Sequence, residues 1–167
     1  MMPYLLVLAL GLAALIQVSL LPAMRVAGVY PNLTLMVVVA WALLRGARSA
    51  IVWAIIAGLW LDLLSGRAFG GYTLGLVLAA YLAGLGAQTI YRPTLLLALA
   101  LAGVMTIVQD GIQLVLLWLG GGTFSPSDAL LRLVLPEILY NSVVMLAVYP
   151  LLAWIHQATS QERLPLE

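Results

Sequence analysis

The sequence contains no cysteine and a single histidine, His156, among its 167 residues. Without cysteine the chain has no disulfide framework, no thiol catalysis and no cysteine-ligated metal site. One histidine also leaves little scope for imidazole catalysis or a histidine-based metal centre, so we expect neither a metal nor another cofactor. His156 falls near the end of the last apolar run, and we interpret it as an interfacial residue.

Charge is also scarce. Only 8% of the residues are charged and the formal net charge is +1, which argues against nucleic acid or an acidic partner. By contrast, 65% are hydrophobic and the mean hydropathy is +1.15, which leaves too little polar surface to cover a soluble globule. A helix of about 20 apolar residues is enough to cross a bilayer. The composition therefore predicts an all-α, polytopic membrane protein.

Turn-forming and charged residues divide the chain into six apolar runs, which predict a bundle of six transmembrane helices. Their predicted bounds are 3–21, 33–44, 49–64, 72–91, 94–119 and 129–156. We expect one transmembrane domain, 1–156, and a short cytoplasmic tail, 157–167. The first run lacks the basic start and the small-residue cleavage site of a secretory signal, so we expect a retained helix.

The second run, 33–44, is too short to span a bilayer by itself. As a helix it rises only about 18 Å, against a hydrocarbon core of about 30 Å. The helix must therefore begin earlier, tilt, or be shielded by its neighbours.

Arginine placement predicts the orientation of the chain. Six helices put Arg45, Arg48, Arg92 and Arg163 on the side of the termini, and Arg25, Arg67 and Arg132 on the other. The positive-inside rule therefore favours cytoplasmic termini in a multi-pass membrane protein. An aromatic belt is expected at the outer interface, from Tyr30, Trp60, Tyr72, Trp118 and Phe124.

Polar side chains inside the apolar runs are the strongest functional signal. A charge at the centre of a membrane helix costs about 3 kcal/mol or more, so such residues normally face a bundle interior or a water-filled cavity. Counting about 1.5 Å per helical residue places several in one layer, displaced toward the outside. The partner or pocket candidates are Gln17, Asp62, Asp110, Gln113, Glu137 and Asn141.

Helical spacing brings some of these residues onto common faces. Asp110 and Gln113 share a face with Thr106, and Glu137 and Asn141 are an i, i+4 pair. Two acids and several amides could then meet in one wet pocket. The alternative is that amides such as Gln17, Gln109 and Asn141 only join helices through hydrogen bonds, each worth about 0.6 kcal/mol on average.

Asp62 differs from the other acids because it lies within a turn of the C-terminal end of its predicted helix. The helix dipole disfavours an anion there, unless the side chain is simply solvated. Arg67 or Arg132 would be its natural partner. We expect Asp62 to act in assembly, at a helix end that a partner can reach.

Small residues and prolines suggest where helices pack or bend. Small residues spaced by four let helix backbones approach, within the bundle or against another membrane protein. The packing or docking candidates are Ala9, Ala13, Gly58, Gly66, Gly70 and Gly84. Pro136 and Pro150 remove backbone donors from the last run and are expected to kink it.

Several short motifs occur in a characteristic order. They are P-N-L at 31–33, A-L-L-R-G at 42–46, G-L-W-L-D-L-L-S-G at 58–66, F-G at 69–70, Y-L-A-G at 81–84 and Y-P-L at 149–151. Over essentially the whole chain this order resembles the MreD family of rod shape-determining proteins. The resemblance implies a non-enzymatic subunit of the bacterial cell-elongation machinery in the inner membrane. It also implies an MreC-like bitopic partner and, through it, MreB, a RodA-type glycosyltransferase and a class B penicillin-binding protein.

The resemblance also raises a rival function. MreD proteins are similar in fold to the S-components of energy-coupling factor transporters, six-helix bundles with an outward-opening pocket. A small-molecule-binding subunit of that kind would use the polar layer for its ligand, whereas a scaffold would leave the pocket to a partner loop or membrane lipid. The scaffold is favoured because no loop carries the dense polar and aromatic set of a selective vitamin site. An enzyme with an Asp110 and Glu137 dyad is the weakest alternative, because no flanking motif supports it.

Overall fold

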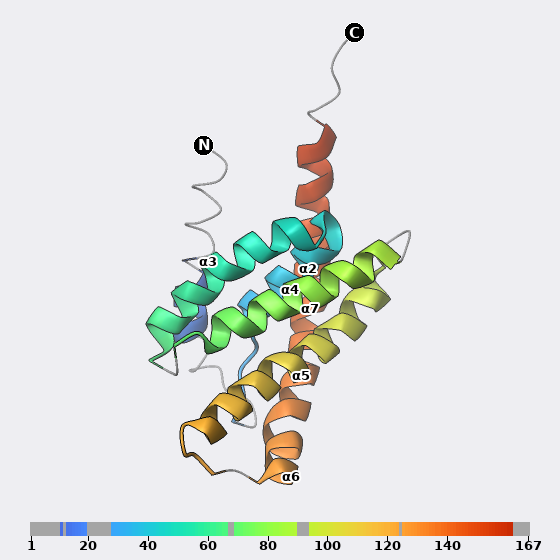
Figure 1. The fold of residues 1–167 in the computed structure, drawn as a ribbon. Helices are drawn as coiled ribbons and strands as arrows, with labels where there is room; N and C mark the ends of the chain where they lie inside the picture. The colour runs from blue at the N-terminus through green and yellow to red at the C-terminus, as the bar shows by residue number, and fades with distance from the viewer. Residues whose placement is uncertain are drawn as a thin grey trace.

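A computed structural model of the chain describes residues 11, 13–19, 28–66, 69–89, 94–123 and 125–161. The described elements are helices, which confirms the all-α prediction (Figure 1). They are α2 (Leu33–Arg45), α3 (Ala47–Ser65), α4 (Gly71–Thr89), α5 (Leu95–Leu119), α6 (Pro126–Ala129), the π-helical turn η2 (Leu130–Val134) and α7 (Leu135–Gln161). Residues 13–19 are also helical, whereas most of the predicted run 3–21 lies outside the described residues.

Local chemistry explains where these helices begin and end. The hydroxyl of Thr94 accepts a hydrogen bond from the backbone N–H of Leu97 at 3.3 Å and so caps the start of α5. Gly46, with a φ of 82°, separates α2 from α3. Gly66, with a φ of 64°, ends α3 in the left-handed conformation that glycine adopts without steric cost. The predicted bounds of these helices agree with the structure to within about two residues.

The last predicted run, 129–156, is longer and less regular than expected. It begins with α6 and passes through η2 before α7, which continues to Gln161. The π-helical turn ends at Val134, two residues before Pro136, whose missing N–H disturbs the regular hydrogen-bond ladder at this point. Pro150 lies inside α7 without ending it.

Helix α2 is the centre of the bundle and contacts α3, α4, α5 and α7. In Figure 1, α3, α4 and α5 run side by side with alternating directions, and α7 crosses them steeply. Leu35, Met36 and Val39 of α2 are fully buried in the hydrophobic core. Of the three explanations for the short second run, shielding by neighbouring helices is therefore the one that the structure supports.

Within the described residues, three helices are long and apolar enough to cross a membrane: 47–65, 95–119 and 126–157. Two shorter apolar helices, 33–45 and 71–87, lie among them in the described chain. These helices support a polytopic membrane protein, and six complete spans stay a prediction. The turns after α3 and after α5 lie at one end of the bundle, and the α2–α3 connection lies at the opposite end (Figure 1).

Glycines bring α3 and α4 into close contact. A Cβ atom added at Gly58 would overlap the Cα atom of Thr73, and one added at Gly84 would overlap the Cα atom of Ala47. These two glycines therefore pack inside the bundle, which was one of the two predicted roles.

The other predicted packing residues do not share that role. Gly66 and Gly70 have positive φ angles of 64° and 93°, and a Cβ atom added at either would meet no atom within 4 Å. They therefore serve the turn between α3 and α4 rather than helix packing. Ala13 is half-buried in the helical segment 13–19, and Ala9 lies outside the described residues.

Candidate functional site

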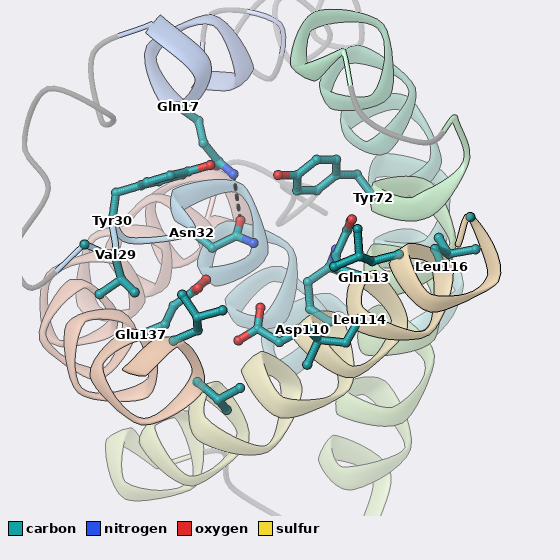
Figure 2. A pocket seen from close by; sticks show the side chains of 16 residues that line it. Gln17, Val29, Tyr30, Asn32, Tyr72, Asp110, Gln113, Leu114, Leu116 and Glu137 are labelled. Carbon is teal, nitrogen blue, oxygen red and sulfur yellow. Dashed lines mark hydrogen bonds between the residues drawn. The ribbon is translucent and has the colours of Figure 1, made fainter. Parts of the chain in front are cut away.

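Buried hydrogen bonds surround the N-terminus of α2. The side-chain oxygen of Asn32 accepts from the backbone N–H of Leu35 at 3.1 Å and caps the helix. The same oxygen accepts from the amide nitrogen of Gln17 at 2.9 Å, as Figure 2 shows. The amide oxygen of Gln17 accepts from the backbone N–H of Thr34 at 2.8 Å. Gln17 thus connects the first helix to the start of α2.

Asn141 completes this network from α7. Its side-chain oxygen accepts from the backbone N–H of Asn32 at 2.7 Å, and its amide nitrogen donates to the hydroxyl of Thr106 at 2.9 Å. That hydroxyl donates to the backbone carbonyl of Ala102 at 2.7 Å. A helix end buried away from water must have its N–H groups satisfied by side chains. Asn141, like Gln17, therefore acts as a hydrogen-bonding residue of the fold, as the packing interpretation predicts.

A cavity of about 700 Å³ lies beside this network. Four of the predicted residues line it: Gln17, Asp110, Gln113 and Glu137. Asn32 also lines the cavity, so the capped end of α2 forms part of its wall. Helical periodicity and depth along the chain therefore identified four side chains that the fold brings together from the first helix, α5 and α7.

The two acids of the cavity come from different helices. Asp110 on α5 and Glu137 on α7 are half-buried, and their carboxyl groups point into the same space (Figure 2). Both acids therefore lie on the wall of the cavity. None of the described residues that line the cavity is basic. The cavity wall therefore combines acidic groups with neutral polar groups.

Two amides of α5 lie one turn apart on the cavity wall. Gln109 is only 1% exposed, and within the described chain neither polar atom of its amide has a hydrogen-bond partner. The amide nitrogen of Gln113 is likewise buried without such a partner. Gly75 and Gly71 of α4 make room for them, because a Cβ atom at either position would press against Gln109 or Gln113, respectively. The prediction that Gln109 joins helices through a hydrogen bond is therefore wrong for the described residues.

Two tyrosines of the cavity were assigned to the membrane interface by sequence reasoning. Tyr72 is 7% exposed, and its hydroxyl points toward the centre of the cavity (Figure 2). Tyr30 lines the opposite side. Both tyrosines adjoin turns at the end of the bundle that carries the polar layer. Their position in the sequence, next to these turns, could have indicated that they line the cavity.

Asp62 does not line the cavity and is buried, with 3% exposure. One carboxylate oxygen accepts from the backbone N–H of Tyr72 at 2.9 Å. The other accepts from the backbone N–H of Thr73 at 3.1 Å and from its hydroxyl at 2.6 Å. Asp62 therefore caps the N-terminus of α4, where the helix dipole favours an anion and offsets the unfavourable end of α3.

The expectation that Asp62 lies at an accessible helix end is therefore wrong, because the returning chain covers it. Of the two arginines considered as its partner, Arg132 is instead 3.5 Å from Asp128 in an exposed ion pair. Arg67 lies outside the described residues.

Together these features define a helical membrane protein with a central short helix and a polar cavity beside its buried end. The model of the rod shape-determining protein MreD family matches residues 1–158, and the chain belongs to that family. Its role is thus in rod shape determination. Neither the comparison with curated proteins nor the comparison with solved structures found a match. The similarity to transporter S-components accordingly stays a prediction.

Proposed function

We propose that this chain is a non-enzymatic scaffold subunit of the bacterial cell-elongation complex, in which it holds an MreC-like bitopic protein. The family match over residues 1–158 carries this proposal. Through that partner the chain would be linked to MreB, a RodA-type glycosyltransferase and a class B penicillin-binding protein. In this arrangement the protein lies in the inner membrane with both termini in the cytoplasm, as its arginine placement predicts.

The face of α3 that carries the longest motif, 58–66, is the proposed contact for the partner's transmembrane helix. Gly58 and Asp62 point inward, where they serve the contact with α4. Leu59 and Leu63 of the same motif are exposed, Leu63 by 68%. One motif thus combines residues that fix the α3–α4 pair with apolar side chains available to a neighbour in the membrane.

Affinity purification of the tagged chain from native membranes tests the scaffold proposal. We expect a bitopic MreC-like protein to copurify. Recovery of an ATPase module without that protein would contradict the scaffold and favour the transporter alternative.

A photo-crosslinking residue at position 63 extends this test to the proposed face. Position 139 on α7 is a matched control, because Leu139 is also an exposed leucine, at 71%. Crosslinks to the partner from 63 and not from 139 are expected. The reverse pattern would move the contact from α3 to α7.

A further inference from the structure

We propose that α4 and α5 separate at their cavity end, so that the contact between these two helices is a gate in the wall of the cavity. Helix α4 packs on both α3 and α5. Its contact with α3 is close and includes a buried cap, whereas its contact with α5 encloses polar groups that lack partners in the described chain. This movement lies within the bundle and does not depend on the scaffold proposal.

Helices α3 and α4 form one unit. A Cβ atom added at Gly58 would overlap the Cα atom of Thr73, near the start of α4, and one added at Gly84 would overlap Ala47 farther along the helix. The carboxylate of Asp62 accepts from the first turn of α4 through both of its oxygens. Separating α3 from α4 would break these hydrogen bonds and lose the close backbone contact.

Helix α5 is held to α7 instead. The amide nitrogen of Asn141 on α7 donates to the hydroxyl of Thr106 on α5 at 2.9 Å, and this hydrogen bond is buried. One turn earlier on α5, a Cβ atom added at Gly103 would lie 3.4 Å from the side chain of Ile138 on α7. A movement that keeps these contacts carries α5 with α7 and leaves α4 with α3.

The contact between α4 and α5 is unfavourable at the cavity end. Gln109 and Gln113 of α5 are packed against Gly75 and Gly71 of α4, respectively. Gln109 is only 1% exposed, and neither polar atom of its amide has a hydrogen-bond partner in the described chain. Exchanging the amide oxygen and nitrogen of Gln109 would not help, because both positions lack a partner. Buried polar atoms nearly always have one, so the closed contact carries a desolvation cost that separation relieves.

Farther from the cavity, the same two helices meet through apolar atoms. A Cβ atom added at Gly86 of α4 would lie 3.6 Å from the side chain of Leu101 on α5, an ordinary van der Waals distance. Ala83 and Ala98, from the same parts of the two helices, are fully buried in the hydrophobic core. The opening is therefore confined to the cavity end, and the apolar end of the contact acts as the hinge.

Opening of this contact extends the cavity between the two helices. Tyr72 lines the cavity from the first turn of α4, and Gln109, Gln113 and Leu116 line it from α5. Figure 2 shows the side chains of Tyr72 and Gln113 entering the cavity from these two helices. Leu74, next to Gly75 on α4, is 60% exposed on the outside of the bundle. The gate therefore leads sideways, from the cavity to an apolar surface that suits a bilayer.

A substitution whose effect on stability has the opposite sign to that of its control tests the cost of the closed contact. Gln109→Met replaces the amide with an apolar side chain of similar length and helix propensity. We expect the midpoint of thermal unfolding of the full chain in detergent to rise, because the closed state no longer buries unsatisfied groups.

Gln17→Met is the matched control. It makes the same change at an amide that is bonded at 2.9 Å and 2.8 Å, so its midpoint should fall. A fall for Gln109→Met as well would overturn the proposal, because it would show that the Gln109 amide has a partner in the closed state.

The rate of cysteine labelling tests the movement itself. Ala79 of α4 is fully buried and lies one turn from Gly75 on the same helical face, so Ala79→Cys should react with N-ethylmaleimide only when the gate opens. Adding Gln109→Met should slow this reaction by at least about tenfold, which corresponds to about 1.4 kcal/mol and to the cost of an unsatisfied buried group.

Ala57→Cys is the control for the labelling. Ala57 is an equally buried alanine of α3, next to the close contact at Gly58, and its reaction should be slower and unaffected by Gln109→Met. Labelling of position 79 that Gln109→Met leaves unchanged would overturn the proposal, as would equally fast labelling of position 57. Circular dichroism establishes that each variant is folded, and the unfolding midpoints alone decide the question if a cysteine variant is not.

Discussion

Asp62→Ala is expected to lower the free energy of unfolding by about 3 kcal/mol, a cost set by charge-assisted hydrogen bonds and the loss of a helix cap. The substitution removes the acceptors for two backbone N–H groups at the start of α4, those of Tyr72 and Thr73, and for the Thr73 hydroxyl. The bond from Tyr72 is buried and those from Thr73 are partly buried, so water replaces the lost acceptors only in part. Unfolding in mixed micelles, followed by circular dichroism, measures the loss.

Two further variants make the origin of this loss clear. Asp62→Asn keeps one acceptor oxygen but loses the charge and the second acceptor, so its loss of stability should be intermediate. Asp128→Ala removes an exposed acid of a surface ion pair and should change stability by less than about 0.5 kcal/mol. Normal stability of Asp62→Ala together with loss of partner binding would contradict the capping role and restore a contact role for Asp62.

Asn141→Leu is expected to lower the free energy of unfolding by about 2 kcal/mol, the scale of leaving a buried polar group unsatisfied. Leucine has a similar size, so the loss would come from hydrogen bonding rather than from an empty space. The backbone N–H of Asn32 loses its acceptor at 2.7 Å, and the hydroxyl of Thr106 loses a donor. The same unfolding measurement applies.

Ser142→Ala provides the control on the same helix. The Ser142 hydroxyl donates to the backbone carbonyl of Ile138, four residues earlier. Such a bond within one helix contributes little to stability, so we expect a change of less than about 0.5 kcal/mol. Similar losses of unfolding free energy for Asn141→Leu and Ser142→Ala would show that the hydrogen bond from α7 to the start of α2 does not stabilise the fold.

The helices and four residues of the cavity could be predicted because their signals are local. Apolar runs between turn residues gave the helix bounds, and counting residues from the turns put Gln17, Asp110 and Glu137 at similar depth. Gln113 followed from its place on the same helical face as Asp110. The cavity could be predicted without knowing which helices are neighbours, because polar side chains within membrane helices tend to face the interior of the bundle.

The role of Asp62 could not be predicted, because it depends on a second helix. Considered on α3 alone, Asp62 lies at the unfavourable end of a dipole. The turn formed by Gly66 and Gly70 returns α4 against it and supplies a favourable helix start. Asn32 is a similar case, since its backbone bond to Asn141 joins residues 109 positions apart. The burial of the Gln109 amide also depends on a neighbouring helix, because Gly75 of α4 lies directly against it.

In the scaffold proposal, the cavity end of the bundle faces the outer side of the inner membrane, and the end of α7 lies in the cytoplasm. Accessibility labelling tests this orientation directly. The chain has no cysteine, so Ser127→Cys and Gln157→Cys each introduce one exposed thiol without changing any charge. An impermeant maleimide applied to spheroplasts should label position 127, and should label position 157 only after the membrane is permeabilised. Labelling of 157 and protection of 127 in intact spheroplasts would contradict this orientation.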